Sequence, residues 1–295
     1  MYLIAGVTGN TGSEAAAALL DRGEPVRVLV RDEQKGEPWR ARGADVAVGL
    51  LDDARSLSQA LKGADGLYFL VPPNMTAPDI NAHYRRFVGA LTDALSQNKL
   101  AHVVYLSTWG AHLPNGPFTM HFAAEQAFRS LATPFTLLRA SFFMENTAGF
   151  LPSILESGVL PSFFAPDRKL PMVAAKDIGQ TAAAALIERP SATRAIELTG
   201  PAEYSMNEVA EAFSRAVGKP VRVAPVPEDQ IVPAMRNMGA SDSVARFFQG
   251  MSAALGRGEI AAEGGEAQFI RGKVTLDQFV HDLLQENRAR TKTAA

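Results

Sequence analysis

The feature that most constrains the fold of this 295-residue chain is a regular alternation of short apolar runs with longer helical patterns in its first half. The apolar runs are, in order, YLIAGV, PVRVLV, DVAV, DGLYFLV and HVVYLS. Helical patterns follow the first four runs, over 14–21, 33–42, 54–61 and 79–96. This alternation predicts a parallel sheet with helices on both faces. A nearly all-apolar run such as LYFLV is typical of a strand that is covered on both sides. We therefore predict an α/β fold with a doubly wound parallel sheet.

The second half of the chain has a different rhythm, which predicts a smaller second region. After FTLLRA (135–140) the sequence is rich in aromatic residues and is interrupted by prolines. We place the sheet domain at 1–150 and a smaller α+β region at 151–295. The segment 173–200 is expected to return to the sheet domain, because a helix pattern from Lys176 is followed by AIELTG. Further on, Ser205 and Glu208 have the spacing of a capping box, which predicts a helix that ends at Gly218.

Composition and charge exclude several kinds of chemistry. The chain has no cysteine, so disulfides, thiolate nucleophiles and cysteine-bound metals are excluded. A net charge of -2 provides no broad basic field, which argues against a nucleic-acid partner. No apolar run reaches the ~18 residues of a membrane span, and the start lacks a signal-peptide pattern. We expect a cytoplasmic protein without a membrane partner. No metal is predicted, because four histidines lack metal-ligand spacing with carboxylates: His83, His102, His112 and His281.

Three glycines lie between the first apolar run and the first helical pattern, at Gly6, Gly9 and Gly12. A tight turn at this place leaves backbone N–H groups free at a helix N-terminus, where a phosphate can bind. Ligands of such sheets bind at the carboxyl ends of the strands. A plain strand-to-helix turn is the alternative, but the position at the start of the alternating series favours dinucleotide binding. The loop residues expected to contact the cofactor are Gly6, Thr8, Gly9, Asn10, Thr11 and Gly12.

The second apolar run ends in Arg31 and Asp32, a cation beside an anion at the place where an adenine ribose would lie. An aspartate about 20 residues beyond the glycines would accept from the ribose hydroxyls of NAD, whereas an arginine would pair with the additional phosphate of NADP. Lys35 adds a second cation. We favour NADP(H), with NAD(H) as the alternative cofactor. A solvated charged turn without a ligand is the remaining interpretation.

The sequence resembles the NmrA-like atypical short-chain dehydrogenases, especially the subgroup of NAD(P)H quinone oxidoreductases, azoreductases and triphenylmethane reductase. The resemblance spans nearly the whole chain. It rests on GVTGNTG (6–12), VRVLVRDEQK (26–35), SLSQALKGADGLYFLVPP (56–73), HFAAEQAF (121–128) and FTLLRASFFMEN (135–146). It implies a Rossmann domain with a smaller C-terminal substrate region. It also implies additional cofactor contacts, at Leu70, Val71, Pro72, Ser107, Thr108 and His121.

The Tyr-Lys dyad of ordinary short-chain dehydrogenases is absent, because none of the five tyrosines has a lysine four residues later. Aligning Glu125 with the glutamate of the family places His121 where that lysine would be. The resemblance also implies that members of the reductase subgroup have a histidine at this position. With an unperturbed pKa near 6.5, a histidine can bind the nicotinamide ribose or supply a proton. The alternative is a helix-start residue that is satisfied by neighbouring backbone.

The substrate pocket is expected beyond the fifth apolar run. Ser107 and Thr108 lie where short-chain enzymes place a substrate-orienting hydroxyl, and Trp109 follows them and can stack on a flat substrate or the nicotinamide. The alternative is that these residues cap the next segment. Phe142 and Asn146 match the FMEN stretch of the family and are predicted to border the pocket, although aromatic residues at this density also suit a core. The predicted catalytic residues are His121, Ser107 and Asn146.

Together these features predict an NADPH-dependent oxidoreductase that transfers hydride to a small, planar, hydrophobic acceptor such as a quinone, an azo compound or an imine. Neither flavin nor metal is expected, because the nicotinamide carries the hydride chemistry. One alternative is a non-catalytic redox sensor of the NmrA type, which would control a protein partner. Another is a reductase of secondary metabolism. The sequence leaves a homodimer open.

Overall fold

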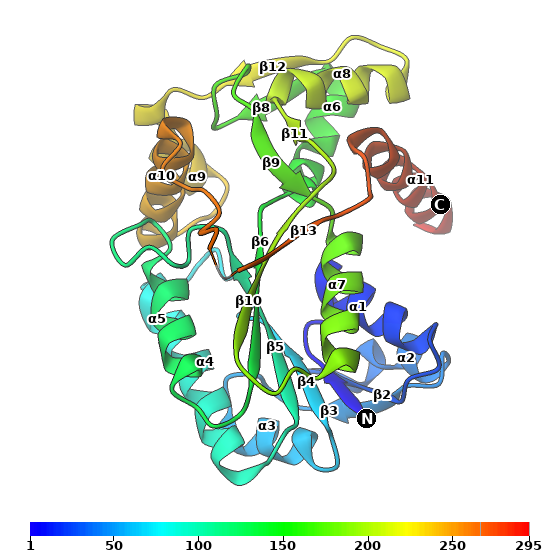
Figure 1. Ribbon diagram of the computed structural model, residues 1–295. Coiled ribbons are helices and arrows are strands. Elements are labelled where there is room, and N and C mark those ends of the chain that lie inside the picture. Colours follow the sequence, from blue (N-terminus) through cyan, green and yellow to red (C-terminus); the bar gives the residue numbers. More distant parts are fainter. Residues whose placement is uncertain (266, 295) are drawn as a thin grey trace.

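The computed structural model describes residues 1–265 and 267–294. Its largest element is an eight-stranded sheet with the order β13-β10-β6-β5-β4-β1-β2-β3 (Figure 1). All seven strand pairings in this sheet are parallel, so the predicted doubly wound α/β fold is confirmed. The run β3-β2-β1-β4-β5-β6 is the Rossmann strand order. The strands are β1 (Tyr2–Ile4), β2 (Val26–Val30), β3 (Asp45–Val48), β4 (Gly66–Phe69), β5 (His102–Thr108), β6 (Phe135–Ala140), β10 (Arg194–Thr199) and β13 (Gln268–Arg271).

Helices cover both faces of this sheet. One face packs on α1 (Asn10–Leu20), α2 (Glu37–Arg40) and α7 (Ala175–Glu188), and the other on α3 (Ala54–Leu61), α4 (Ile80–Gln97) and α5 (Thr119–Arg129). In β1, Tyr2 and Ile4 belong to the first hydrophobic core, whereas Leu3 belongs to the second. Because successive side chains of a strand point to opposite faces, a strand between two helical layers has to be apolar throughout.

Two of the expected helices differ in their bounds. Helix α1 begins at Asn10 rather than at residue 14, because Gly9 is already its N-cap and the glycine loop is correspondingly short. The helix expected over 33–42 consists of the 3-10 turn η1 (Glu33–Lys35) and the short α2, with Gly36 between them. The side chain of Asp32 caps η1 by accepting from the backbone N–H of Gln34 at 3.0 Å.

The second half of the chain builds a smaller α+β region above the carboxyl ends of the sheet strands (Figure 1). Its core includes Met144, Met172 and Phe213. Its strands form two small sheets, β11-β9-β7 and β12-β8. The elements are β7 (Phe142–Phe143), η2 (Met144–Phe150), α6 (Leu151–Ser157), β8 (Val159–Ser162), β9 (Leu170–Val173), β11 (Glu203–Tyr204), α8 (Met206–Val217), β12 (Arg222–Pro225), α9 (Glu228–Asn237), α10 (Asp242–Arg257) and α11 (Leu276–Ala294).

The chain passes more than once between the two parts. Strand β10 lies beside β6 in the large sheet, and β13, within the segment that the sequence assigned to the smaller region, pairs with β10. Helix α8 begins with the predicted capping box: Ser205 Oγ accepts from the Glu208 N–H at 3.2 Å, and Glu208 Oε2 accepts from the Ser205 N–H at 2.7 Å. This helix ends at Gly218 in the left-handed conformation. In the described part of the chain, no helix is both long and apolar enough to cross a membrane.

Candidate active site

The glycine loop 6–12 connects β1 to α1, and close packing explains two of its glycines. Gly6 has a φ of +71°, and a Cβ there would lie 2.6 Å from Leu70 Cδ2. Gly12 lies in the first turn of α1, where a Cβ would lie 2.4 Å from the carbonyl oxygen of Gly6 and 2.5 Å from that of Ala5. Real Cβ atoms do not approach backbone oxygens so closely. Helix α1 can therefore sit against the end of β1 only if residue 12 is glycine.

The N-terminus of α1 is suited to an anion. Gly9, its N-cap, has no side chain to offer, so no side chain caps the helix, and its first turn has no acidic residue. The first N–H groups of a helix lack intrahelical acceptors, and the helix dipole adds partial positive charge there. The backbone N–H groups of residues 9–12 could hold a pyrophosphate group of a dinucleotide.

Charged residues follow β2 at the place where the sequence predicted the adenine ribose. Asp32 Oδ1 accepts a capping hydrogen bond from the N–H of Gln34 at 3.0 Å, and the rest of this exposed carboxylate can still accept from a ligand. Arg31 and Lys35 are exposed, and within the described residues their side chains have neither a hydrogen bond nor an ion pair. These two exposed cations could bind a 2′-phosphate, and the Asp32 carboxylate beside them could accept from a ribose hydroxyl.

A cavity of about 490 Å³ extends from the glycine loop into the space between the large sheet and the smaller region. It contains twelve of the predicted site residues: Gly6, Gly9, Asn10, Thr11, Leu70, Val71, Ser107, Thr108, Trp109, His121, Phe142 and Asn146. No described Asp, Glu, Lys or Arg lines this cavity. These twelve predicted residues therefore line one continuous space.

Five predicted site residues lie outside this cavity. Thr8 lines a separate groove beside α11, and Gly12 is packed under the loop. Arg31 and Lys35 lie beyond the end of β2. The carbonyl oxygen of Pro72 is 2.8 Å from Nε2 of His83, a contact that anchors the segment after β4. These positions suit the pyrophosphate and adenosine parts of a dinucleotide rather than its reactive end.

Sequence reasoning missed several residues of the cavity wall. They come from α4, from the start of α5, from α10 and from the segment after it: Tyr84, Phe118, Met251, Leu255 and Ile260. No local pattern marks them, because each looks like an ordinary apolar or amphipathic position of its own segment. Contacts between segments far apart in the sequence, such as α4 with α5 and Phe118 with Phe247 of α10, bring them to the cavity.

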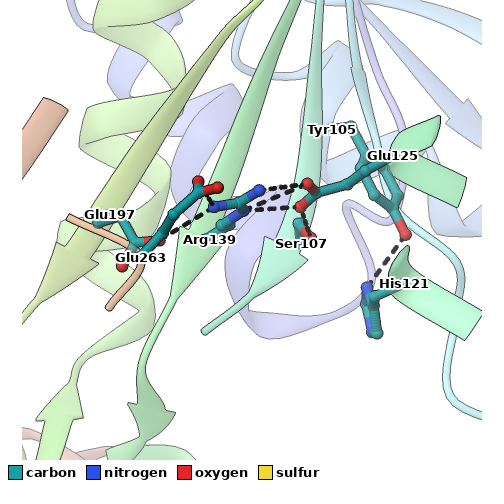
Figure 2. A network of polar contacts seen from close by, with 7 residues as sticks. All are labelled: Tyr105, Ser107, His121, Glu125, Arg139, Glu197 and Glu263. Atoms are coloured by element: carbon teal, nitrogen blue, oxygen red, sulfur yellow. Dashed lines mark hydrogen bonds and ion pairs between the residues drawn. The ribbon is translucent and has the colours of Figure 1, made fainter. Parts of the chain in front are cut away.

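A buried ionic network lies behind the cavity wall and joins β5, α5, β6 and β10 (Figure 2). Arg139 Nη2 donates to Glu125 Oε2 at 2.6 Å, and Arg139 Nη1 lies 3.2 Å from Glu197 Oε1 and 2.5 Å from Glu263 Oε2. The side chains of Arg139, Glu125 and Glu197 are each 1% exposed.

The network also reaches Ser107 in the cavity wall. Ser107 Oγ donates to Glu125 Oε1 at 2.6 Å, so its hydrogen is committed to a buried carboxylate (Figure 2). A hydroxyl has one hydrogen to donate. Ser107 therefore presents lone pairs to a ligand rather than a hydrogen, which limits its predicted catalytic role to accepting a hydrogen bond.

His121, on the first turn of α5, is held between two tyrosine hydroxyls. Its Nε2 is 2.9 Å from Tyr84 Oη, and its Nδ1 is 3.1 Å from Tyr105 Oη. The alternative in which neighbouring backbone satisfies this side chain is thus wrong. Burial lowers the pKa of His121 to about 3, because desolvation disfavours the imidazolium and neither tyrosine partner carries a charge. At neutral pH His121 is uncharged and is not itself a strong acid.

Comparison with known proteins identifies the family of this chain. The NmrA-like family model matches residues 2–259, so the chain belongs to the NmrA-like family. An NAD(P)H azoreductase of Xenophilus azovorans is 32% identical over 250 residues, which are 83% of this chain and 84% of that protein. Quinone oxidoreductase 2 of Escherichia coli is 24% identical over 294 residues, 97% of this chain and 100% of that protein.

Solved structures share the fold. The NADPH complex of the Escherichia coli NADPH-dependent quinone oxidoreductase superposes with a TM-score of 0.77 at 22% identity, over 96% of this chain and 100% of that one. The NADP(H) complex of the Citrobacter triphenylmethane reductase superposes with a TM-score of 0.76 at 23% identity, over 96% of this chain and 99% of that one.

Proposed function

We propose that this protein, an NAD(P)H-dependent oxidoreductase, uses NADPH to reduce a small, planar, uncharged conjugated acceptor such as a quinone, an azo compound or an imine. The observation that carries the proposal is the continuity of the site: Gly6 and Gly9 of the glycine loop line the same cavity as Trp109 and Phe142. A dinucleotide with its pyrophosphate on the loop has its nicotinamide end directed into this aromatic space.

The bound cofactor would supply the hydride, and the residues of this chain would hold the two reactants in contact and away from water. The phenyl ring of Phe142 and the indole of Trp109 offer flat apolar surfaces for a planar acceptor. Asn146 adds an amide that can orient a polar atom. Ser107 can accept a hydrogen bond, for example from an amide N–H of the nicotinamide.

The uncharged wall supports a neutral acceptor. Moving a charged group from water into an apolar space without a partner carries a large free-energy cost. We therefore expect neutral quinones to react faster than their sulfonated analogues. The free side chains of Arg31 and Lys35 support NADPH over NADH, as do the NADPH and NADP(H) complexes among the structural neighbours.

The test uses the purified full chain. Binding of NADPH and NADH is measured first, by quenching of protein fluorescence. Loss of nicotinamide absorbance is then followed with matched acceptors: a neutral naphthoquinone, its sulfonate, a neutral azo dye and an imine. Oxidation of NADPH by a neutral acceptor, with at least about tenfold lower kcat/KM for the sulfonate, supports the proposal. Binding of NADPH without oxidation by any acceptor overturns it and identifies a cofactor-binding sensor.

A further inference from the structure

The two tyrosines that flank His121 differ in their surroundings. Tyr105 is 0% exposed and packs against Phe69 and Phe128. Tyr84 belongs to the cavity wall. In the described part of the chain each hydroxyl has one hydrogen-bond partner, a ring nitrogen of His121. The neutral imidazole has one N–H donor and one acceptor nitrogen, so its two tyrosine contacts must run in opposite directions.

The burial of Tyr105 determines those directions. If Tyr105 accepted from Nδ1–H, its own O–H would point into an apolar core without an acceptor. A buried donor that makes no hydrogen bond is more costly than an unused lone pair. Tyr105 therefore donates to Nδ1, and the proton of His121 lies on Nε2. Nε2–H then donates to Tyr84 Oη, which leaves the Tyr84 O–H free to point into the cavity.

We propose that Tyr84 is the hydrogen-bond donor for the acceptor atom that gains negative charge in the reaction, and that Tyr105 and His121 are positioning residues that keep its hydroxyl hydrogen directed into the cavity. The proposal rests on the reductase function above. It assigns a chemical task to a tyrosine from α4, a helix outside every motif that the sequence singled out. Ser107 cannot fill this role, because its hydrogen is committed to Glu125.

Bound NADPH would supply a hydride to the acceptor and be oxidised, and the acceptor would become an anion at its oxygen or nitrogen. Tyr84 O–H stabilises this anion by a charge-assisted hydrogen bond and remains intact. Burial raises the pKa of Tyr84, which keeps its hydroxyl protonated. The proton that completes the neutral product comes from water when the product leaves.

The first experiment replaces the hydroxyl alone. In Tyr84→Phe we expect kcat for a neutral quinone to fall about 10- to 100-fold, the scale of one hydrogen bond to a charged group. The Kd for NADPH and the melting temperature should stay close to those of the unaltered protein. Tyr204→Phe, in β11 outside the cavity, is the matched control and should retain full turnover. An unchanged kcat in Tyr84→Phe overturns the proposal.

The second experiment reads the tautomer directly. ¹⁵N chemical shifts of the His121 ring, identified by loss of its signals in His121→Asn, should show an unprotonated Nδ1 and a protonated Nε2 in the apo protein. In Tyr105→Phe this preference should weaken and kcat should fall about threefold or more, although Tyr105 lies outside the cavity. A protonated Nδ1 in the unaltered protein overturns the proposal. If none of the tested acceptors is reduced by NADPH, the proposed reductase function fails. The tautomer of His121 can still be measured in that case.

Discussion

The imidazole of a solvent-exposed histidine has a pKa near 6.5, but the imidazole of His121 is surrounded by aromatic rings. Tyr84 packs against its ring edge to face, with ring centroids 4.8 Å apart, and Phe118 does so at 6.1 Å. Neither neighbour offers a negative charge, so the neutral imidazole is favoured. A neutral imidazole that accepts a hydrogen bond from Tyr105 and donates one to Tyr84 can still orient the Tyr84 hydroxyl. This role does not require His121 to donate a proton to the substrate.

We expect His121→Asn to lower kcat about tenfold while the Kd for NADPH changes by less than about threefold. Asparagine is too short to contact both tyrosine hydroxyls, so Tyr84 loses its orientation, whereas the glycine loop is untouched. Steady-state kinetics and fluorescence titration measure the two quantities. Unchanged turnover would remove His121 from the mechanism.

The pH profile tests the protonation state of His121. Because the pKa of His121 is lowered to about 3, the imidazole stays neutral as pH falls until that value is approached. Burial also raises the pKa of Tyr84 and Tyr105, so neither ionises near neutrality. We expect kcat to be nearly constant between about pH 5 and pH 9. If imidazolium were the acid, kcat would decline as pH rises through about 6.5.

Cofactor choice is also decided at the level of single residues. In Arg31→Ala we expect the Kd for NADPH to rise about tenfold or more, and that for NADH by less than about twofold, because a charge-assisted hydrogen bond to phosphate is lost. Arg22→Ala, an exposed arginine beyond the end of α1, is the control. Equal losses for the two cofactors would contradict the phosphate assignment.

At the scale of elements, the decisive contact is that of α1 with the end of β1. The Cα of Gly12 sits so close to the carbonyl oxygens of Ala5 and Gly6 that no side chain fits between helix and strand. This proximity fixes where the helix N-terminus lies relative to the cavity. Gly89 in α4 is a useful contrast, because a Cβ there would meet nothing within 4 Å.

We expect Gly12→Ala to displace α1, to weaken NADPH binding at least about tenfold, and to lower the free energy of unfolding by about 1–3 kcal/mol. Urea denaturation and fluorescence titration provide the measurements. Gly89→Ala, in open space, should instead leave binding unchanged and stabilise its helix by about 0.5–1 kcal/mol. Normal NADPH affinity in Gly12→Ala would show that the loop does not hold the pyrophosphate.

At the scale of the whole molecule, Arg139 connects the sheet to the segment after α10. Its guanidinium contacts Glu125 of α5, Glu197 of β10 and Glu263, residues far apart in the sequence (Figure 2). Through Ser107 the same network reaches the cavity. A single buried cation thus holds together parts of both halves of the chain behind the site.

We expect Arg139→Met to destabilise the protein by about 3–5 kcal/mol, because two buried carboxylates lose their counter-charge. The loss should be smaller at pH 5 than at pH 8, since carboxyl groups left unpaired in the interior take up protons more readily. Arg215→Met is the control: its ion pair with Asp277 is exposed, so its loss should cost less than about 1 kcal/mol. Equal effects of the two substitutions in urea denaturation would contradict this role of the network.

Much of this molecule could be predicted because the signals are local. Strand β3 and helix α3 lie where the sequence placed them, the Ser205 capping box is present, and twelve predicted site residues share one cavity. The bounds of α1 and α2 differ, since a short loop and a single glycine decide where a helix begins. The contact of Tyr84 with His121 and the lowered pKa of His121 were not predictable, because both depend on which distant side chains surround them.

The sequence by itself determined the alternating α/β fold, the glycine loop and the cations after β2, because periodicity, backbone freedom and charge are properties of short segments. Tertiary structure decided that Asp32 accepts a capping hydrogen bond, that Ser107 gives its hydrogen to Glu125 and that burial lowers the pKa of His121. Hydrogen-bond partners and burial are set by residues that meet only when the chain is folded. They determine which of the predicted side chains can bind, donate or carry charge.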